Sequence, residues 1–204
     1  VSKFGSVDFD YVLILASRLP SEKIEDKDYN IAIDKIMRAL KALSQCFSSA
    51  TKFLFVSSFA VYSPDLGIIR EGSKALAHSP YAKSKLSLES LLGNFVHDHG
   101  ASLLICRMPV FVYFGGKNNF LSKVIERTRN GESISLSNPH SYFTALFDVE
   151  CLSDLIKAKW SGVNVLNCGA DRDLTFKHLS EIALNWGARD VHWKHSERPS
   201  QQVD

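Results

Sequence analysis

The 204-residue sequence lacks the features of several classes of protein. Its four cysteines are far apart and form no C-x-x-C pair, which argues against a disulfide framework or a zinc site and favours reduced thiols. No apolar run approaches the roughly 20 residues that a membrane helix needs, and no segment is typical of a signal peptide. We therefore expect a cytoplasmic protein that has no membrane partner.

The chain also lacks an excess of charge of one sign. Its formal net charge is +2, and its Lys and Arg residues form no run that follows a phosphate backbone, so we expect no nucleic-acid partner. His97 and His99 do not predict a bound metal, because side chains two residues apart on a helix point in different directions. The 45% content of hydrophobic residues is typical of a globular protein with a buried core.

Two kinds of segment alternate along the sequence. Short runs rich in Val, Ile, Leu and Phe have no polar alternation, which is typical of parallel strands buried on both faces. The expected strands are residues 11–16, 53–57, 103–106 and 163–166. Helical patterns cover residues 33–47, 80–96, 120–129, 149–160 and 176–186, and residues 63–78 are expected to form a loop. This order predicts an open α/β sheet with right-handed crossovers.

The stretch from the second strand to the second helix carries the candidate chemistry. The strand ends at Ser57-Ser58, and Ser79-Pro80 is a strong helix start, with Gly100 placed to end the helix. Tyr81 and Lys85 are four residues apart and share one helical face. A nearby ammonium lowers the pKa of a tyrosine from about 10, and a serine hydroxyl completes a proton relay between an alcohol and a ketone.

The spacing Y-x-x-x-K alone also describes a tyrosine packed beneath a solvated lysine. Here, however, it follows an apolar strand, Ser-Ser, Val61-Tyr62, a loop and Ser-Pro-Tyr. The whole arrangement resembles the extended short-chain dehydrogenase/reductases, that is, the NAD-dependent epimerase/dehydratase family of nucleotide-sugar enzymes. The resemblance implies that Ser58, Tyr81 and Lys85 are catalytic and that Lys85 also holds the nicotinamide ribose.

Other segments resemble the same family. Residues 10–17 (DYVLILAS) are similar to a strand whose small residues pass beneath the cofactor, and residues 104–109 (LICRMP) to a strand that lines the nicotinamide pocket. The implied cofactor-binding residues are Ala16, Ser17, Ser57, Tyr81, Lys85, Met108, Pro109 and Val110. The implied substrate-binding residues are Asn30, Ser58 and Tyr81. Asn30 matches an Asn that opens a helix in the family, although a plain helix cap explains it equally well.

The implied fold is α/β, a Rossmann-like doubly wound parallel sheet with a small C-terminal substrate-binding region. We expect residues 1–110 to form a partial dinucleotide-binding domain and residues 111–204 to hold the substrate-binding part and a returning Rossmann strand. The implied activity is NAD- or NADP-dependent epimerisation, dehydration or reduction of a nucleotide-linked or related sugar. By the same resemblance we expect a homodimer.

The sequence departs from the family in three ways. No G-x-x-G-x-x-G follows a strand, so we expect about two βα units, roughly 60 residues, to be missing ahead of Val1. The chain is also expected to stop early at its other end. Val110 stands where an Asn is usual, and no Arg lies near residues 142–144, where the family often binds a nucleotide phosphate. These changes motivate an alternative: a non-catalytic dinucleotide-sensing or interaction module on the same fold.

Overall fold

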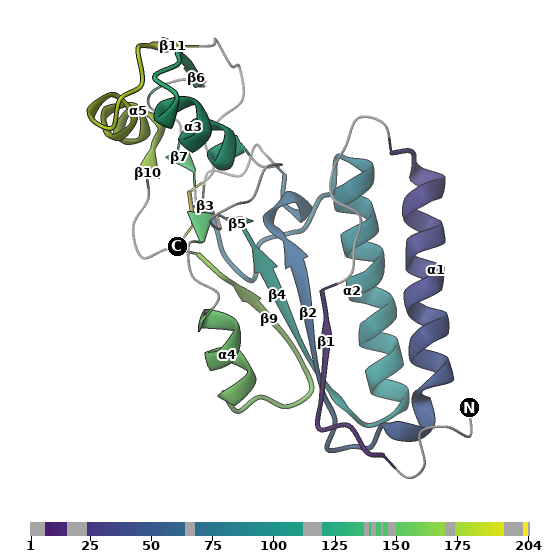
Figure 1. The fold of residues 1–204 in the computed structure, drawn as a ribbon. Helices are drawn as coiled ribbons and strands as arrows, with labels where there is room; N and C mark the ends of the chain where they lie inside the picture. Colours follow the sequence, from purple (N-terminus) through teal and green to yellow (C-terminus); the bar gives the residue numbers. More distant parts are fainter. Residues whose placement is uncertain are drawn as a thin grey trace. The chain divides into compact units, whose positions relative to one another are not determined.

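The structure is a computed structural model that describes residues 7–15, 24–63, 68–111, 120–136, 139, 142–143, 145–146, 150–169, 174–193 and 202–203 (Figure 1). The chain forms two compact units. Unit 1 comprises Val1–Ser63, Lys74–Met108 and Cys151–Asn167, and unit 2 comprises Pro64–Ser73, Pro109–Glu150 and Cys168–Asp204.

Unit 1 contains a four-stranded parallel sheet. Its strands are β1 (Tyr11–Ile14), β2 (Lys52–Ser58), β4 (Ser102–Met108) and β9 (Val163–Asn167), in the order β1-β2-β4-β9. The four predicted strands are thus confirmed, and the arrangement is Rossmann-like. Successive residues of β2, Leu54 and Phe55, are both fully buried, so this strand is covered on both faces. That double burial explains why the sequence shows no polar alternation there.

Two long helices, α1 (Asp26–Ala42) and α2 (Pro80–Asp98), lie side by side along the sheet (Figure 1). Both predicted helices are confirmed, and a short 3-10 turn, η1 (Ser44–Cys46), follows α1. Aromatic rings fill the space between helix and sheet: the Phe47 ring meets the edges of Phe53 and Phe95 at centroid distances of 5.1 and 6.0 Å. This apolar core fixes α2 over the two central strands.

The first turn of α2 is set by its capping residues. Ser79 is the N-cap, its hydroxyl accepts a hydrogen bond from the Ala82 N–H at 3.1 Å, and Pro80 occupies the first helical position. Gly100 follows the C-terminal end with a φ of +63°, a conformation that favours glycine. Both predicted ends are confirmed, and they determine that Tyr81 lies in the first turn.

The start of α1 corrects one sequence-based interpretation. Glu25, not Asn30, is the N-cap, and its backbone N–H donates to the Asp28 carboxylate at 3.2 Å. Asn30 lies inside the helix with an exposed side chain. The interpretation of Asn30 as a helix cap is therefore wrong, because an acidic capping pair starts the helix several residues earlier.

Unit 2 is built from short pieces. The helices α3 (Phe120–Arg129) and α5 (Phe176–Asn185) pack with β6 (Ile134–Leu136) and β11 (Val191–Trp193), which pair in parallel. Three further strand pairs have only two residues per strand: β3 (Ile68–Ile69) with β12 (Gln202–Val203), β5 (Val110–Phe111) with β8 (Ala145–Leu146), and β7 (Tyr142–Phe143) with β10 (Leu174–Thr175).

The remaining helix is α4 (Glu150–Lys157), so α3, α4 and α5 confirm the three later helices that the sequence predicts. The stretch expected to be a loop contains β3, a strand too short to leave a periodic pattern in the sequence. In the part of the chain that the structure describes, no helix is long and apolar enough to cross a membrane.

Candidate active site

Tyr81 and Lys85 are one turn apart on α2, and the side chain of Lys85 contacts β2. The Lys85 ammonium donates a hydrogen bond to the Val56 carbonyl at 2.7 Å, and its Nζ lies 5.0 Å from the Phe55 ring centroid and 5.7 Å from the Tyr81 ring centroid. Lys85 is only 3% exposed. The alternative of a tyrosine beneath a solvated lysine is therefore wrong, because this ammonium is buried against the strand and the phenol.

The buried position perturbs the ionisation of Lys85. Burial lowers the pKa of its ammonium from 10.5 to about 8, and the negative charge of Glu89 partly opposes this shift. The group therefore still carries its charge at neutral pH. A positive charge with little surrounding water favours the phenolate form of a neighbouring tyrosine, which is the electrostatic requirement for Tyr81 to exchange a proton.

Ser58 is the last residue of β2 and begins the short 3-10 turn η2 (Phe59–Val61). Its hydroxyl oxygen accepts a hydrogen bond from the Ala60 N–H at 3.2 Å. Because the oxygen accepts in this bond, the hydroxyl can still donate its own proton to another group. The turn η2 packs against α2, so the element that carries Ser58 contacts the helix that carries Tyr81 and Lys85.

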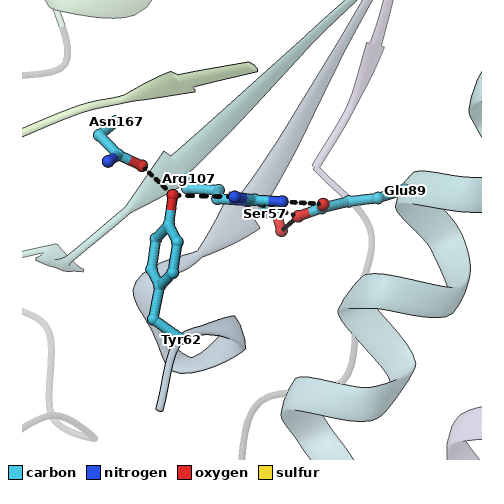
Figure 2. Close-up of polar contacts among 5 residues, drawn as sticks. All are labelled: Ser57, Tyr62, Glu89, Arg107 and Asn167. Atoms are coloured by element: carbon cyan, nitrogen blue, oxygen red, sulfur yellow. Dashed lines mark hydrogen bonds and ion pairs between the residues drawn. The ribbon is translucent and has the colours of Figure 1, made fainter. Parts of the chain in front are cut away.

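Beside these residues lies a buried polar network that the sequence did not reveal (Figure 2). The Glu89 carboxylate accepts hydrogen bonds from the Ser57 hydroxyl at 2.5 Å, from Arg107 Nε at 3.2 Å and from Arg107 Nη2 at 2.7 Å. On its other side Arg107 Nη1 donates to the Tyr62 hydroxyl at 2.8 Å, and Tyr62 donates to Asn167 Oδ1 at 2.8 Å. We call Ser57, Tyr62, Glu89, Arg107 and Asn167 the polar network.

The charges of the polar network are balanced inside the protein. The side chains of Glu89 and Arg107 are each 8% exposed, so neither charge is solvated. Burial lowers the pKa of Arg107, but the hydrogen bonds and charges of Glu89 and Tyr62 outweigh it and leave that pKa above its ordinary value. Arg107 is therefore a permanent cation, and Glu89 is its counter-ion.

The other predicted cofactor-binding residues are divided between unit 1, unit 2 and the part of the chain outside the described residues. Ser57 is buried, and its hydroxyl donates a hydrogen bond to the Glu89 carboxylate. Met108 is the buried last residue of β4, whereas Pro109 and Val110 belong to unit 2. Ala16 and Ser17 lie outside the described residues.

One neighbour of the candidate site was missed in the sequence. Tyr29, on α1 and 4% exposed, packs its ring against that of Tyr81 at a centroid distance of 6.3 Å. Tyr29 immediately precedes Asn30, whose side chain is exposed. The contact between Tyr29 and Tyr81 depends on how α1 packs against α2. The Y-x-x-x-K motif lies within α2 alone and therefore does not reveal this contact.

The motifs and the fold agree with a known family. The family model for the NAD dependent epimerase/dehydratase family matches residues 1–159. The chain belongs to this family. The resemblance noted in the motifs is therefore confirmed. The family is one of NAD-dependent enzymes, which also confirms the expected class of protein and kind of cofactor.

Solved structures with the same fold include two UDP-sugar 4-epimerases. UDP-N-acetylglucosamine 4-epimerase from Bacillus cereus is 19% identical, with a TM-score of 0.74 over 96% of this chain and 69% of that one. UDP-glucuronic acid 4-epimerase from Bacillus cereus, in complex with NAD, is 17% identical, with a TM-score of 0.78 over 97% and 66%. RMD from Pseudomonas aeruginosa, complexed with NADPH, is 21% identical, with a TM-score of 0.74 over 96% and 71%.

These identities are low, so the structural matches show that the fold is shared and leave the substrate open. No curated protein matches the chain in sequence. The assignment to the family thus stands on the family model, and the fold agrees with it.

Proposed function

We propose that the protein transfers hydride between NAD or NADP and a carbinol carbon of a nucleotide-linked sugar, with Tyr81 as the acid or base. One observation carries the proposal: the Nζ of the buried Lys85 lies 5.7 Å from the Tyr81 ring centroid and donates a hydrogen bond to the Val56 carbonyl near the end of a parallel strand. Ligands of open α/β sheets bind outside the carboxyl ends of the strands, and Lys85 donates to the carbonyl of Val56, two residues before the end of β2.

Each of the three residues has a separate role. In the oxidising direction the sugar hydroxyl gives its proton to the Tyr81 phenolate, and in the reducing direction Tyr81 returns it to the carbonyl oxygen. The positive charge of Lys85 stabilises the phenolate. The Ser58 hydroxyl donates a hydrogen bond to the same sugar oxygen and so orients it. A bound nicotinamide supplies or accepts the hydride at the carbon.

The residues present fit the nicotinamide end of a dinucleotide. Lys85 offers N–H donors for ribose hydroxyls, and Tyr81 lies on the same helical face. Ser57 and Met108 lie near the ends of β2 and β4. We retain them, with Pro109, Val110, Ala16 and Ser17, as proposed cofactor contacts. The related structures that contain NAD and NADPH support this choice of cofactor.

The substrate is proposed from the printed names of the related structures. Both Bacillus cereus relatives are UDP-sugar 4-epimerases, which supports a nucleotide-linked sugar as the substrate. Epimerisation, dehydration and net reduction share the same proton step and so stay alternatives within the proposal. Asn30 stays a proposed substrate contact, and a cytoplasmic homodimer stays the proposed state of the protein.

The substitution Tyr81→Phe tests the proposal in the purified full-length protein. Removing the phenolic proton is expected to lower kcat on a panel of nucleotide sugars by about 10²- to 10⁴-fold. Binding of NADH or NADPH, followed by fluorescence, is expected to stay within about twofold, because the ring remains. The control is Tyr11→Phe, which removes a hydroxyl from a 40% exposed tyrosine on β1 and is expected to change neither quantity.

Two results contradict the proposal. Unchanged turnover in Tyr81→Phe rules out the phenol as the acid or base. Binding of NADH or NADPH by the wild-type protein, without turnover of any sugar in the panel, favours the dinucleotide-sensing module instead.

A further inference from the structure

We propose that Glu89 and Arg107 are positioning residues that hold the Tyr81–Lys85 face of α2 against the strand end that carries Ser58. The inference rests on the proposed function, because it concerns the placement of the same three groups. Neither residue touches the substrate in this proposal. They act through the helix and the turn to which their partners belong.

Glu89 lies on the same face of α2 as the two proposed relay residues. Tyr81, Lys85 and Glu89 are successive four-residue steps, so they form one stripe along the helix. Glu89 accepts hydrogen bonds from the second-last residue of β2 and, twice, from Arg107 on β4. These three bonds fix both the rotation of α2 about its axis and its height above the sheet. The same two quantities decide where Tyr81 lies relative to Ser58.

Ser58 lies between two residues of the polar network. Ser57, immediately before it, is held by Glu89. Tyr62, immediately after η2, accepts from Arg107 and donates to Asn167 on β9. The turn that presents Ser58 is therefore anchored at both ends by one ion pair (Figure 2).

The apolar core does not require charges at the position of Glu89 and Arg107. One step earlier on the same strands, Phe55 and Ile105 are paired neighbours in the apolar core, and Ser57 and Arg107 are the next such pair. A buried ion pair can often be replaced by apolar residues without loss of stability. A geometric and electrostatic role near the proposed site accounts for the charges better than a contribution to stability alone.

The ion pair also influences the proposed relay electrostatically. The negative charge of Glu89 raises the pKa of Lys85 against the effect of burial. Arg107 is paired with the same carboxylate at 2.7 Å and opposes its charge. The Glu89–Arg107 pair thus places a partly compensated negative charge beside Lys85 and also holds α2 in position.

The test compares single and double variants of the full-length protein. In Glu89→Gln the shape is kept and the charge is lost, and we expect kcat to fall at least tenfold while KM for the nucleotide sugar changes less than threefold. The basic limb of the kcat profile is expected to move to lower pH, because Lys85 loses the charge that raises its pKa. The control Asp34→Asn removes a carboxylate from the exposed Arg38–Asp34 pair on α1, and we expect wild-type kinetics.

The double variant Glu89→Met with Arg107→Met separates positioning from stability. We expect its thermal midpoint to lie near that of the wild type and its kcat to stay at least tenfold lower. If the double variant regains both stability and kcat, the positioning role is wrong and the pair is only structural. If the double variant does not fold, the pH profile of Glu89→Gln decides, and an unshifted profile with wild-type kcat overturns the proposal.

The proposed function can fail separately. In that case the wild-type protein turns over no sugar, and the titration of the Lys85 ammonium, followed by NMR in the cofactor-free protein, takes the place of kinetics. An unchanged Lys85 titration in Glu89→Gln, compared with wild type, then overturns the inference, and a lowered midpoint supports it.

Discussion

The side of the sheet that faces α1 and α2 changes character along the strands. Two successive rows of paired residues are apolar: Phe53, Leu103 and Val163, then Phe55, Ile105 and Val165. The third row, two residues further, consists of Ser57, Arg107 and Asn167. The apolar rows and the polar row have the same backbone pairing, so the difference lies in the side chains alone.

Helix α2 is also divided into a polar and an apolar part, but here the polar part comes first along the chain. Its later turns present Leu92, Phe95 and Val96 to the core, whereas its earlier turns carry Tyr81, Lys85 and Glu89. The polar ends of the helix and of the strands therefore coincide. The comparison teaches that one end of this layer holds the fold together and that the other end positions reactive groups.

The largest effect on stability is expected at the apolar end. Phe53 is fully buried and meets the rings of Phe47 and Phe95. Phe53→Ala is expected to lower the free energy of unfolding by about 3–5 kcal/mol, because it removes a large side chain and leaves a cavity. Urea denaturation measures this change.

Phe120→Ala serves as the control for Phe53→Ala. Phe120 is 39% exposed, and the loss expected for the control is below about 1 kcal/mol. Equal losses of unfolding free energy in the two variants would contradict the comparison of the apolar and polar ends. The apolar rows would then contribute no more to stability than a surface residue does.

The apolar rows were predictable from the sequence because each strand of the sheet is a continuous run of apolar residues. The helices were predictable because their apolar residues recur at helical spacing. The ends of α2 were also predictable, since Ser79 caps the helix with its own hydroxyl and Pro80 and Gly100 act through their own backbone. The two-residue strands of unit 2 were not, because a pair such as β3 and β12 joins residues far apart in the chain and leaves no pattern in either segment.

The candidate site was predictable in part. Tyr81 and Lys85 are recognisable because their spacing lies within one helix, but the pairing of Glu89 with Arg107 joins a helix to a strand. A signal was nevertheless present. Ser57, Arg107 and Asn167 each end an apolar run, and Glu89 continues the four-residue steps of Tyr81 and Lys85. Polar residues at the same offset in neighbouring parallel strands indicate one shared row.

A smaller effect, dependent on pH, is expected at the polar end. The pKa of Lys85 is about 8 in the folded protein and 10.5 in the unfolded chain, so the unfolded chain binds more protons between these values. Stability contributed by this group therefore rises with pH across that range, by on the order of 3 kcal/mol, and the cost of the buried charge is fully present below pH 8. Lys85→Met is expected to lose this rise.

The measurement for Lys85 is the free energy of unfolding at several pH values between 7 and 11, in wild type and Lys85→Met. Subtracting one curve from the other removes the titration of all other groups. If the difference between the two free energies of unfolding does not change with pH, the Lys85 pKa is ordinary and the ammonium is hydrated. The two ends of α2 would then not differ in how they bury their side chains. A matched variant on the same helix is Lys83→Met, which removes a lysine whose side chain is exposed.

The smallest effect is expected for Ser57→Ala, within the polar row itself. The Glu89 carboxylate keeps both hydrogen bonds from Arg107 when it loses the one from Ser57, so we expect a loss of only about 1 kcal/mol. Ser180→Ala is the control, since that buried hydroxyl donates to the Lys177 carbonyl at 2.7 Å in unit 2.

The two serine variants separate stability from turnover. Both are expected to lose similar stability in urea, but only Ser57→Ala is expected to lower kcat, because the residue it changes precedes Ser58. If Ser57→Ala instead destabilises the protein as strongly as Phe53→Ala and leaves kcat unchanged, the polar row serves the core. The division between the two ends of the layer would then be one of composition and not of role.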